Sequence, residues 1–443
     1  MDINPSIFKS YDVRGIVGKE LTEEAAFSIG RAFANYTKGK RIAVGRDARL
    51  FSDLLFELFV SGVVSEGADV YDLGEISTDM IYFAVGGLKY DGGAMITASH
   101  NPKEYNGFKM VDKDNNFIKG GAIREFLEKH EFLKSERKGE IKIVDIYEEY
   151  LKHIFSFVDF NKIHPFKIVV DASNGMAGKV IPLIQDKLKI DLIPLNFKLD
   201  GNFPNHSPNP LLEGSTDQIK KEILKTGADF GFIFDGDADR IFLVDEMGNL
   251  IRGDITILLL AKYLLKKNPN TGIAYNAICS KAVPEFIKKW GGNPVRTKVG
   301  FVNVKEGLLN NNGIMGGEVS GHFCFRDNFY SDSGFIAFLI LLQALSETEG
   351  KVSETAKSLS PYFKTPEINF ETEDKEKVLQ NIKERYKDGK QDYLDGVTVE
   401  YKDWWFNIRP SGTEPLVRLV IEADTKELME KKERELKEFL GIK

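Results

Sequence analysis

Short apolar runs alternate with amphipathic stretches of helical length along most of this chain, and this alternation limits the possible folds most strongly. The runs are rich in residues that favour strands, as in Arg41–Gly45, Ala68–Asp72, Phe166–Asp171 and Phe230–Phe234. Strands that alternate with helices are typical of an α/β fold. Because one hydrophobic core stops growing at about 250 to 300 residues, a chain of 443 residues is expected to contain several domains.

A short internal repeat links two of these domains. Met110–Gly120 and Leu243–Gly253 have Val, Asp, Asn, Ile and Gly at matching offsets, and each segment follows a polar loop. The first loop contains Ser99, and the second extends from Asp235 to Arg240. The repeat therefore predicts two related domains that present these loops from equivalent positions.

Capping residues and changes of sequence pattern predict where helices begin and where domains end in the rest of the chain. Asp254 is expected to cap a helix over Ile255–Leu265, and Asp332 or Ser333 a helix that begins at Phe335. Beyond about Pro361 a more charged segment predicts a separate small domain. Its expected elements are a strand, a helix over Lys375–Lys387, strands around Val397 and Leu416, and a last helix over Lys426–Leu440. The predicted domains are residues 1–145, 146–248, 249–362 and 363–443.

Net charge and composition exclude several classes of partner. A net charge of −7 disfavours a nucleic-acid or anionic-membrane surface, so anionic ligands must be bound by local basic groups. The longest apolar run, Phe335–Leu342, falls far short of the roughly 20 residues of a membrane span. The first residues lack the pattern of an export signal, and Cys279 and Cys324 form no disulfide framework or metal motif. A cytoplasmic protein is expected.

The segment Ala94–Lys103 begins as a buried strand and becomes polar at Thr97, which places Ser99 at a strand end. A turn closed by Asn101 and Pro102 explains such a segment without any chemistry. A serine-hydrolase site is disfavoured, because the Gly-x-Ser-x-Gly turn is absent and neighbouring Ser99 and His100 need not face each other. A covalent role for Ser99 therefore needs support from elsewhere in the chain.

Asp235, Asp237 and Asp239 follow the strand Phe230–Phe234. Two-residue spacing in an extended segment directs all three carboxylates to one side, where their repulsion calls for a cation. Oxygen ligands suit Mg²⁺. An EF-hand calcium loop is disfavoured, because Arg240 stands where that loop needs Gly and a strand follows. A solvated acidic turn is the alternative without a metal.

Two further loops have polar groups that suit a phosphorylated sugar. In Ile408–Leu416, backbone N–H groups around Ser411-Gly412-Thr413 can surround an anion, and Arg409 adds a guanidinium. In Gly316–Phe323, alternating positions expose Glu318, Ser320 and His322, which can donate to and accept from sugar hydroxyls. Taken alone, each loop is equally typical of an ordinary turn.

Together, and in this order, the four loops resemble those of the α-D-phosphohexomutase family over essentially the whole chain. The matching motifs are Thr97-Ala-Ser-His-Asn-Pro102, Asp235-Gly-Asp-Ala-Asp-Arg240, Gly316-Gly-Glu-Val-Ser-Gly-His322 and Arg409-Pro-Ser-Gly-Thr413. The resemblance implies four domains around a central cleft. Three would share an α/β core, and the last would be a smaller α+β domain similar to the TATA-box-binding protein.

The resemblance also implies roles for residues. Ser99 would be the phosphoserine and, with Asp235, Asp237 and Asp239, would hold Mg²⁺. Glu318 and Ser320 would contact the sugar, and Arg409, Ser411, Gly412 and Thr413 the phosphate. Further positions that match the family near the reacting groups or the substrate are Tyr11, Arg14, His100, Lys109, Arg240, Lys298 and His322. Lys109 or His322 would manage the proton of the reacting hydroxyl.

The implied reaction exchanges hexose 1-phosphate and hexose 6-phosphate. Phosphorylated Ser99 would transfer its phosphoryl group to a sugar hydroxyl, and the resulting hexose 1,6-bisphosphate would turn end for end before returning one phosphoryl group. The same bisphosphate would prime the enzyme. Hexose phosphates are thus the expected partners, without nucleic acid or membrane, and the oligomeric state stays open.

The opening Tyr11-Asp-Val-Arg-Gly15 resembles phosphomannomutase/phosphoglucomutase members, which favours mannose and glucose phosphates. The Arg409 motif also occurs in the phosphoglucosamine branch, and Val319 departs from the residues usual in both branches. A phosphoglucosamine mutase therefore remains an alternative. A catalytically silent sugar-phosphate-binding protein is another, although intact Ser99 and the three aspartates argue against it.

Overall fold

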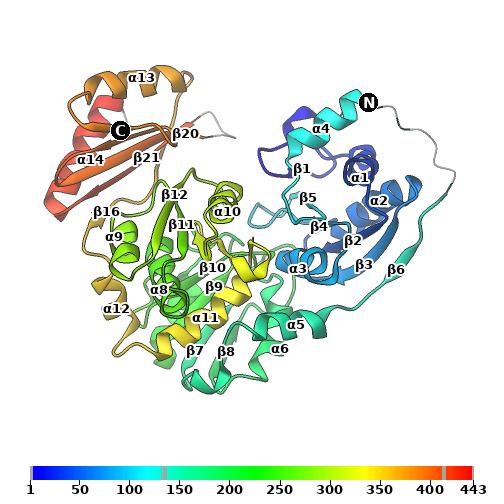
Figure 1. Ribbon diagram of the computed structural model, residues 1–443, viewed down its shortest axis with the longest axis horizontal. Helices are drawn as coiled ribbons and strands as arrows, with labels where there is room; N and C mark the ends of the chain where they lie inside the picture. The colour runs from blue at the N-terminus through cyan, green and yellow to red at the C-terminus, as the bar shows by residue number, and fades with distance from the viewer. Residues whose placement is uncertain (1–2, 131, 133–136, 412–415, 442–443) are drawn as a thin grey trace. The chain divides into compact units, whose positions relative to one another are not determined.

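The computed structural model describes residues 3–130, 132, 137–411 and 416–441. It forms two compact units, one from Met1–Arg252 with Ser320–Ser353 and the other from Gly253–Val319 with Glu354–Lys443. Figure 1 shows the helices and strands of both units. In the part of the chain described, no helix is long and apolar enough to cross a membrane.

The first unit begins with a mixed sheet in the strand order β1-β5-β4-β2-β3-β6. Strands β3 and β4 both pair in parallel with β2, whereas β5 pairs antiparallel with β4. The strands are β1 (Val13–Ile16), β2 (Arg41–Arg46), β3 (Asp69–Glu75), β4 (Gly92–Ile96), β5 (Tyr105–Asp112) and β6 (Ile141–Ile143). The helices around them are η1 (Pro5–Ile7), α1 (Glu23–Thr37), α2 (Ser52–Ser65), α3 (Thr78–Leu88), α4 (Gly120–Lys129) and α5 (Tyr147–Phe155).

A second sheet of the same unit has the order β10-β9-β7-β8. Strand β7 pairs in parallel with β9 and β8, and β10 pairs antiparallel with β9, so the sheet repeats the arrangement β5-β4-β2-β3. Its strands are β7 (Lys167–Asp171), β8 (Asp191–Leu195), β9 (Phe230–Phe234) and β10 (Ile241–Val244), with helices η2 (Phe160–Lys162), α6 (Ala177–Gln185) and α7 (Asp217–Thr226).

The repeat seen in the sequence lies at matching places in these two sheets. After β5, Val111 bridges to Phe117, and after β10, Val244 bridges to Leu250. In each turn one aspartate carboxylate oxygen accepts hydrogen bonds from the backbone N–H groups two and four residues later, at 2.9 and 2.9 Å for Asp112 and at 2.9 and 2.7 Å for Asp245. The prediction of two related domains is confirmed.

The first unit is completed by a hairpin and a buried helix, coloured yellow in Figure 1. These are β14 (Phe323–Phe325), η3 (Arg326–Asn328), β15 (Ser331–Asp332) and α11 (Gly334–Ser346). Ser333 caps α11 by accepting a hydrogen bond from Ile336 N at 3.1 Å, as one of the two predicted caps. Phe335 of α11 stacks on Phe234 of β9 at 5.3 Å between ring centroids, and Phe338 contacts Phe232 edge to face at 5.0 Å, so the helix supports the strand that precedes the aspartates.

In the second unit, β11 (Gly272–Asn276) pairs in parallel with β12 (Asn293–Thr297) and β13 (Met315–Gly317). The accompanying helices are α8 (Gly253–Lys267), α9 (Ala282–Lys289) and α10 (Phe301–Asn310), and α12 (Val352–Ser358) follows α11 in the chain. Asp254 was predicted to cap α8, but α8 begins at Gly253, so Asp254 lies inside the helix. The buried Asp254 carboxylate instead accepts from Ser280 N and Lys364 Nζ, each at 3.0 Å.

The C-terminal part of the second unit is an antiparallel sheet with two helices. Its strands follow the order β16-β21-β20-β19-β18, and β17 also pairs with β21. The strands are β16 (Phe363–Lys364), β17 (Ile368–Glu371), β18 (Lys390–Asp392), β19 (Val397–Glu400), β20 (Trp404–Pro410) and β21 (Leu416–Ala423). Helices α13 (Lys375–Arg385) and α14 (Lys426–Leu440) pack on the sheet through Ile382 and Leu436. This is the predicted small α+β domain.

Candidate active site

Two loops that the sequence singled out meet in the first unit. The Ser99 loop (Thr97–Pro102) connects β4 to β5, and the aspartate loop (Asp235–Arg240) connects β9 to β10. Ser99 is fully buried and has a φ of 53°, in the left-handed region that few residues other than Gly adopt. Its hydroxyl donates a hydrogen bond to Asp235 Oδ2 at 2.8 Å. The equivalent ends of the two related sheets therefore bring the serine to the carboxylates.

Gly236 allows this close approach. A Cβ atom at this position would lie 2.5 Å from the carbonyl oxygen of Ser99, a distance that atoms of the backbone do not tolerate. Glycine is therefore required between Asp235 and Asp237 because the two loops touch there.

The three aspartates form a buried group that fits a cation. One carboxylate oxygen from each of Asp235, Asp237 and Asp239 lies within 4.8 Å of the others. Among the described residues, Oδ1 of Asp237 and Oδ1 of Asp239 are buried and accept no hydrogen bond. Buried carboxylate oxygens without a partner are costly unless a cation binds them, so this donor set suits a hard metal ion.

Lys109 contacts the other oxygen, Oδ2, of two of these carboxylates. Its Nζ donates to Asp237 Oδ2 at 2.7 Å and also to Asp239 Oδ2. Burial alone would lower the pKa of the ammonium, but Asp237 and Asp239 outweigh burial and raise that pKa. Lys109 is therefore a fixed positive charge beside the aspartates.

The pKa values of the aspartates indicate that their negative charge is not fully compensated. Burial raises the pKa of Asp235 well above its ordinary value, and repulsion from Asp239 and Asp237 adds to this effect. For Asp239, burial would also raise the pKa, but Lys109 and Arg240 outweigh it and lower that pKa. The cations of the chain thus leave Asp235 without sufficient compensation, which a metal ion would supply.

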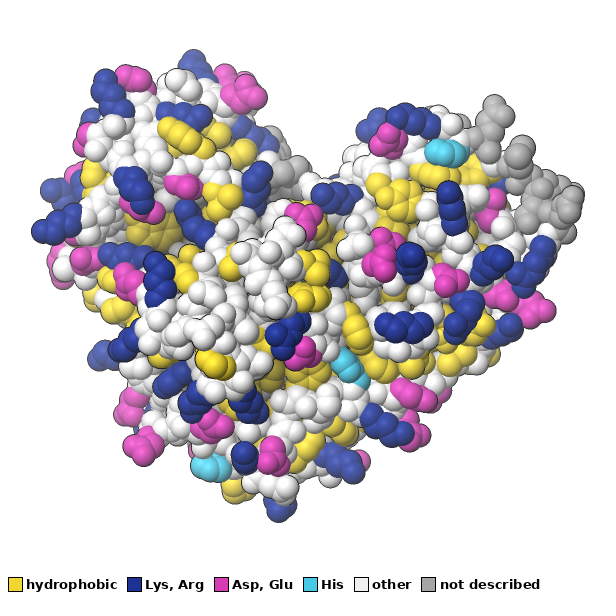
Figure 2. Space-filling view, viewed as in Figure 1, with side chains coloured by type: hydrophobic (Ala, Val, Ile, Leu, Met, Phe, Trp, Pro, Cys, Tyr) yellow, Lys and Arg dark blue, Asp and Glu magenta, His cyan; other side chains and the backbone are white. Residues whose placement is uncertain are grey.

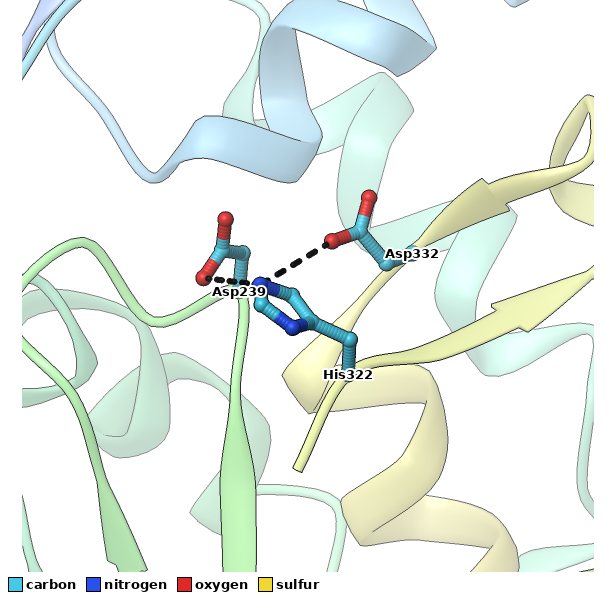
Figure 3. A group of neighbouring side chains, drawn as sticks. All are labelled: Asp239, His322 and Asp332. Carbon is cyan, nitrogen blue, oxygen red and sulfur yellow. Dashed lines mark ion pairs between the residues drawn. The ribbon is translucent and has the colours of Figure 1, made fainter. Parts of the chain in front are cut away.

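His322 lies close to two acidic residues, Asp239 and Asp332, and to Arg240. Figure 3 shows His322 pointing between Asp239 and Asp332, with its Nε2 3.7 and 3.9 Å from their carboxylate oxygens. Arg240 Nε donates to His322 Nε2 at 3.1 Å. A neutral His322 therefore carries its proton on Nδ1, which lies 3.1 Å from Ser320 Oγ. Although Asp239, His322 and Asp332 also have metal-ligand spacing, the lone pair of Nε2 faces Arg240, which favours the three aspartates as the metal group.

Arg14 and His100 contact the Ser99 loop directly. Arg14 donates to Ala98 O at 3.1 Å and to Asn101 Oδ1 at 2.8 Å, and it also pairs with Asp12. His100 Nδ1 lies 3.2 Å from Ser99 Oγ. Burial, with repulsion from Arg240, lowers the pKa of His100 well below its ordinary value, so this ring is neutral. Tyr11 is half-buried one residue before Asp12.

Sequence reasoning missed three residues that hold these loops. Arg49 donates to the carbonyl oxygens of Ser99, Asn101, Pro102 and Tyr105 at 2.7, 2.5, 2.9 and 3.1 Å. Asp47 accepts from Thr97 Oγ1 at 2.5 Å, and Thr78 donates to Asp237 Oδ2 at 2.5 Å. Asp47 and Arg49 follow the end of β2, next to β4, and the carboxyl ends of parallel strands commonly carry sites. That rule was the available signal for Asp47 and Arg49, whereas Thr78 gave none.

The second unit holds the other predicted residues. Glu318 is buried, and its Oε1 accepts from Gly300 N at 2.7 Å and Asn276 Nδ2 at 3.1 Å. Lys298 follows β12 and is exposed.

The predicted phosphate loop lies in the same unit. Arg409 was expected in a loop, but it lies within β20 because that strand continues to Pro410, and its guanidinium pairs with Glu367 at 2.5 Å. The carbonyl of Ser411 accepts from Lys375 Nζ at 2.8 Å. Gly412 and Thr413 lie outside the described residues.

On the face visible in Figure 2, Lys and Arg side chains are interspersed with Asp and Glu. The site itself contains positive charge in the interior, at Arg14, Lys109 and Arg240, which are all partly or fully buried. This distribution agrees with a site for a small anionic ligand rather than for a polyanion.

Models of four consecutive domains match nearly the whole chain. They are described as phosphoglucomutase/phosphomannomutase alpha/beta/alpha domain I (residues 5–133), domain II (148–248) and domain III (252–363), and the C-terminal domain of the same family (367–438).

Similar proteins carry the same names. A phosphomannomutase of Methanocaldococcus jannaschii is 40% identical, covering 98% of this chain and 97% of that protein. A phosphomannomutase of Escherichia coli is 35% identical over 94% of both chains. A crystal structure of a phosphoglucomutase/phosphomannomutase family protein from Burkholderia thailandensis is 32% identical, with a TM-score of 0.91 over 98% of this chain and 97% of that one. This chain therefore belongs to the phosphoglucomutase/phosphomannomutase family and is a phosphohexomutase.

Proposed function

We propose that this enzyme interconverts the 1-phosphates and 6-phosphates of mannose, glucose or both, through a phosphorylated Ser99 and a hexose 1,6-bisphosphate, with Mg²⁺ at Asp235, Asp237 and Asp239. The observation that carries the proposal is the 2.8 Å hydrogen bond from Ser99 Oγ to Asp235 Oδ2. This bond brings the Ser99 hydroxyl to the carboxylates, which supports a phosphoryl group and a metal ion that share one site.

Charge balance supports a divalent cation. Lys109 and Arg240 offset two of the three buried carboxylates, and phosphorylation of Ser99 would add about 1.5 to 2 further negative charges. When bound, Mg²⁺ would neutralise this charge and polarise the phosphoryl group. Mg²⁺ also prefers a few carboxylates together with phosphate oxygen or water, which fits this set of donors.

The chain's own groups would then position and stabilise the transfer. The bond between phosphorus and Ser99 Oγ breaks while a sugar hydroxyl oxygen bonds to phosphorus. The hydroxyl loses its proton, and Ser99 Oγ gains one, so the step is balanced. Arg14 and Arg240 lie where positive charge would stabilise the transferring group. By resemblance, Lys109 or His322 would move the proton, and the raised pKa of Lys109 favours His322, with neutral His100 as a further candidate.

The second unit would supply substrate recognition. By resemblance, Glu318 and Lys298 of this unit would contact the sugar or its phosphate, together with Tyr11 and Ser320 of the first unit. Arg409, Ser411, Gly412 and Thr413 would bind the phosphate that is not being transferred. The four predicted domains, residues 1–145, 146–248, 249–362 and 363–443, would each contribute one of these loops. A cytoplasmic location is supported by two buried cysteines that form no disulfide.

The Ser99 route is tested by mass spectrometry. Enzyme primed with glucose 1,6-bisphosphate should carry one phosphoryl group on Ser99, and Ser99→Ala should lose both the modification and nearly all turnover. A Ser99→Ala variant that turns over normally would reject the phosphoserine mechanism. Isothermal calorimetry that detects sugar-phosphate binding, together with no turnover in primed wild-type enzyme, would instead favour a silent binding protein.

Sugar preference is tested by comparing kcat/KM for mannose 1-phosphate, glucose 1-phosphate and glucosamine 1-phosphate. We expect the first two to exceed the third, since the relatives in the comparison are named phosphomannomutases. A preference for glucosamine 1-phosphate would reassign the enzyme as a phosphoglucosamine mutase and would leave the Ser99 chemistry unchanged.

A further inference from the structure

Thr78 connects helix α3 to the aspartate loop. It is the first residue of α3 and is fully buried. Its hydroxyl donates to Asp237 Oδ2 at 2.5 Å, and its backbone N–H donates to the carbonyl oxygen of Asp237 at 3.1 Å. One residue from a different domain thus holds both the side chain and the main chain of Asp237.

The two oxygens of the Asp237 carboxylate have different surroundings. Oδ2 accepts from Thr78 Oγ1 and from Lys109 Nζ, the latter at 2.7 Å. Oδ1 is buried and accepts no hydrogen bond from the described residues. When two donors hold one oxygen of a carboxylate, the group cannot rotate freely, and the direction of its other oxygen is fixed. The hydroxyl and the ammonium therefore fix which oxygen is presented to a cation.

Thr78 is itself held in place by its neighbour Asp79. The Asp79 carboxylate accepts from Ser77 Oγ and Tyr150 Oη, each at 2.6 Å, and from Ser333 Oγ. These donors come from the residue before α3, from α5 and from the cap of α11. The first turn of α3 is consequently tied to two other helices, and the Thr78 hydroxyl cannot follow Asp237 if the carboxylate rotates.

We propose that Thr78 is a positioning residue for the metal site, because its hydroxyl holds Oδ2 of Asp237 so that Oδ1 faces the cation. This inference rests on the proposed function, which places Mg²⁺ at the aspartates. Partners that orient a metal-ligating carboxylate typically change metal affinity by about 10- to 100-fold when they are removed. Lys109 supplies charge to the same oxygen, whereas the hydroxyl hydrogen bond supplies direction.

Binding of Mg²⁺ to unphosphorylated enzyme, measured by isothermal calorimetry, tests this role without depending on turnover. Thr78→Val keeps the shape of the side chain but removes the hydroxyl, and we expect it to bind Mg²⁺ about 10- to 100-fold more weakly. Thr78→Ser retains the donor and should bind within about threefold of wild type. The Mg²⁺ concentration for half-maximal turnover should rise by the same factor as the dissociation constant, while kcat at saturating Mg²⁺ recovers.

Thr365→Val is the matched control. It also removes a buried threonine hydroxyl, but in the second unit, where Thr365 Oγ1 accepts from Ile421 N at 3.1 Å. It should leave Mg²⁺ affinity unchanged. If Thr78→Val does not fold, Thr78→Ala removes the same donor without a methyl group against the carboxylate. Wild-type Mg²⁺ affinity in the folded Thr78 variants, with weakened binding in Asp237→Asn, overturns the inference alone. Identical titrations of wild type and Asp237→Asn overturn the metal assignment itself and the role of Thr78 with it.

Discussion

Arg49 holds the Ser99 loop in its unusual conformation through a single side chain. Its guanidinium donates to the carbonyl oxygens of Ser99, Asn101, Pro102 and Tyr105, and it is almost completely buried. Four carbonyl groups that converge on one planar donor fix the direction in which the chain turns, and this explains how Ser99 keeps a φ of 53°.

Arg49→Lys is therefore expected to be far from conservative. A lysine has one ammonium at the end of a flexible chain and cannot bond four carbonyls in the plane of a guanidinium. We expect kcat/KM to fall by about 100-fold, the usual cost of a reacting group displaced by roughly 1 Å. The rate at which Ser99 is phosphorylated by the bisphosphate should fall with it.

Arg46→Lys is the control for Arg49→Lys. Arg46 is the last residue of β2, shortly before Arg49 in the chain, but its partners Asp53 and Asp72 are side chains that a lysine can also reach. It should retain most activity. Equal activities of the two variants would show that the loop keeps its shape without Arg49.

At the scale of elements, the Asp79 carboxylate joins three helices at a buried position. Burial raises its pKa from 3.8 to about 6, although Ser333, Ser77 and Tyr150 donate to it. The carboxyl thus binds its proton more tightly in the folded state than in the unfolded chain. The stability contributed by this proton is fully present below pH about 4 and is lost as the pH rises through about 6.

Asp79→Asn removes this titration, so its effect should depend on pH. A shift of about two pKa units corresponds to roughly 3 kcal/mol. The free energy of unfolding of the variant, relative to wild type, should therefore rise between pH 4 and pH 7.5 by up to this amount. Urea unfolding at both pH values measures the difference. Parallel pH profiles for the two proteins would mean that folding does not shift the pKa of Asp79.

Regular elements followed the sequence patterns closely wherever local signals decide. The last helix covers Lys426–Leu440 and β9 covers Phe230–Phe234, as predicted, because periodicity and a polar boundary agree there. Asp254 was misplaced because its carboxylate satisfies Ser280 N and Lys364, which are remote in sequence. Strand β20 extends past its aromatic core to Pro410 because pairing with β21 continues to that point.

The candidate site was predictable only in part for the same reason. Ser99 and the aspartates belong to recognisable loops, and the internal repeat places both loops at equivalent strand ends. Thr78 touches Asp237 across 159 positions of sequence, and Arg49 reaches Ser99 across 50. Contacts of this kind depend on how strands are ordered in the sheets, which no local pattern contains.

Considered as a whole, the molecule carries positive groups in both units against a net charge of −7. Arg14, Lys109 and Arg240 belong to the first unit, whereas Lys375, Arg409 and Arg418 belong to the second. A hexose 1,6-bisphosphate has two phosphates that need separate cationic partners. The proposed reaction would therefore require both units, the first for transfer and the second for recognition.

Glu318 gives the sharpest test of recognition by the second unit. Its Oε1 is used by Gly300 N and Asn276 Nδ2. Glu318→Gln can keep an oxygen at this place while it loses the charge and exchanges the other oxygen for a donor. The fold should therefore persist. Charge-assisted hydrogen bonds to sugar hydroxyls are worth about 1.5 to 3 kcal/mol, so we expect kcat/KM to fall by roughly 10- to 100-fold.

The loss must be the same in both directions of the reaction. Turning a hexose end for end exchanges the approximate places of O3 and O4, so one acceptor can serve both orientations of the substrate. Moreover, the equilibrium constant fixes the ratio of kcat/KM for the 1-phosphate and the 6-phosphate. Both values should be measured at saturating bisphosphate so that priming does not limit, with Glu306→Gln on the exposed side of α10 as the control. Unchanged kcat/KM in both directions would leave Glu318 with a structural role, to which its hydrogen bonds to Gly300 and Asn276 belong, and sugar recognition would then belong to other groups.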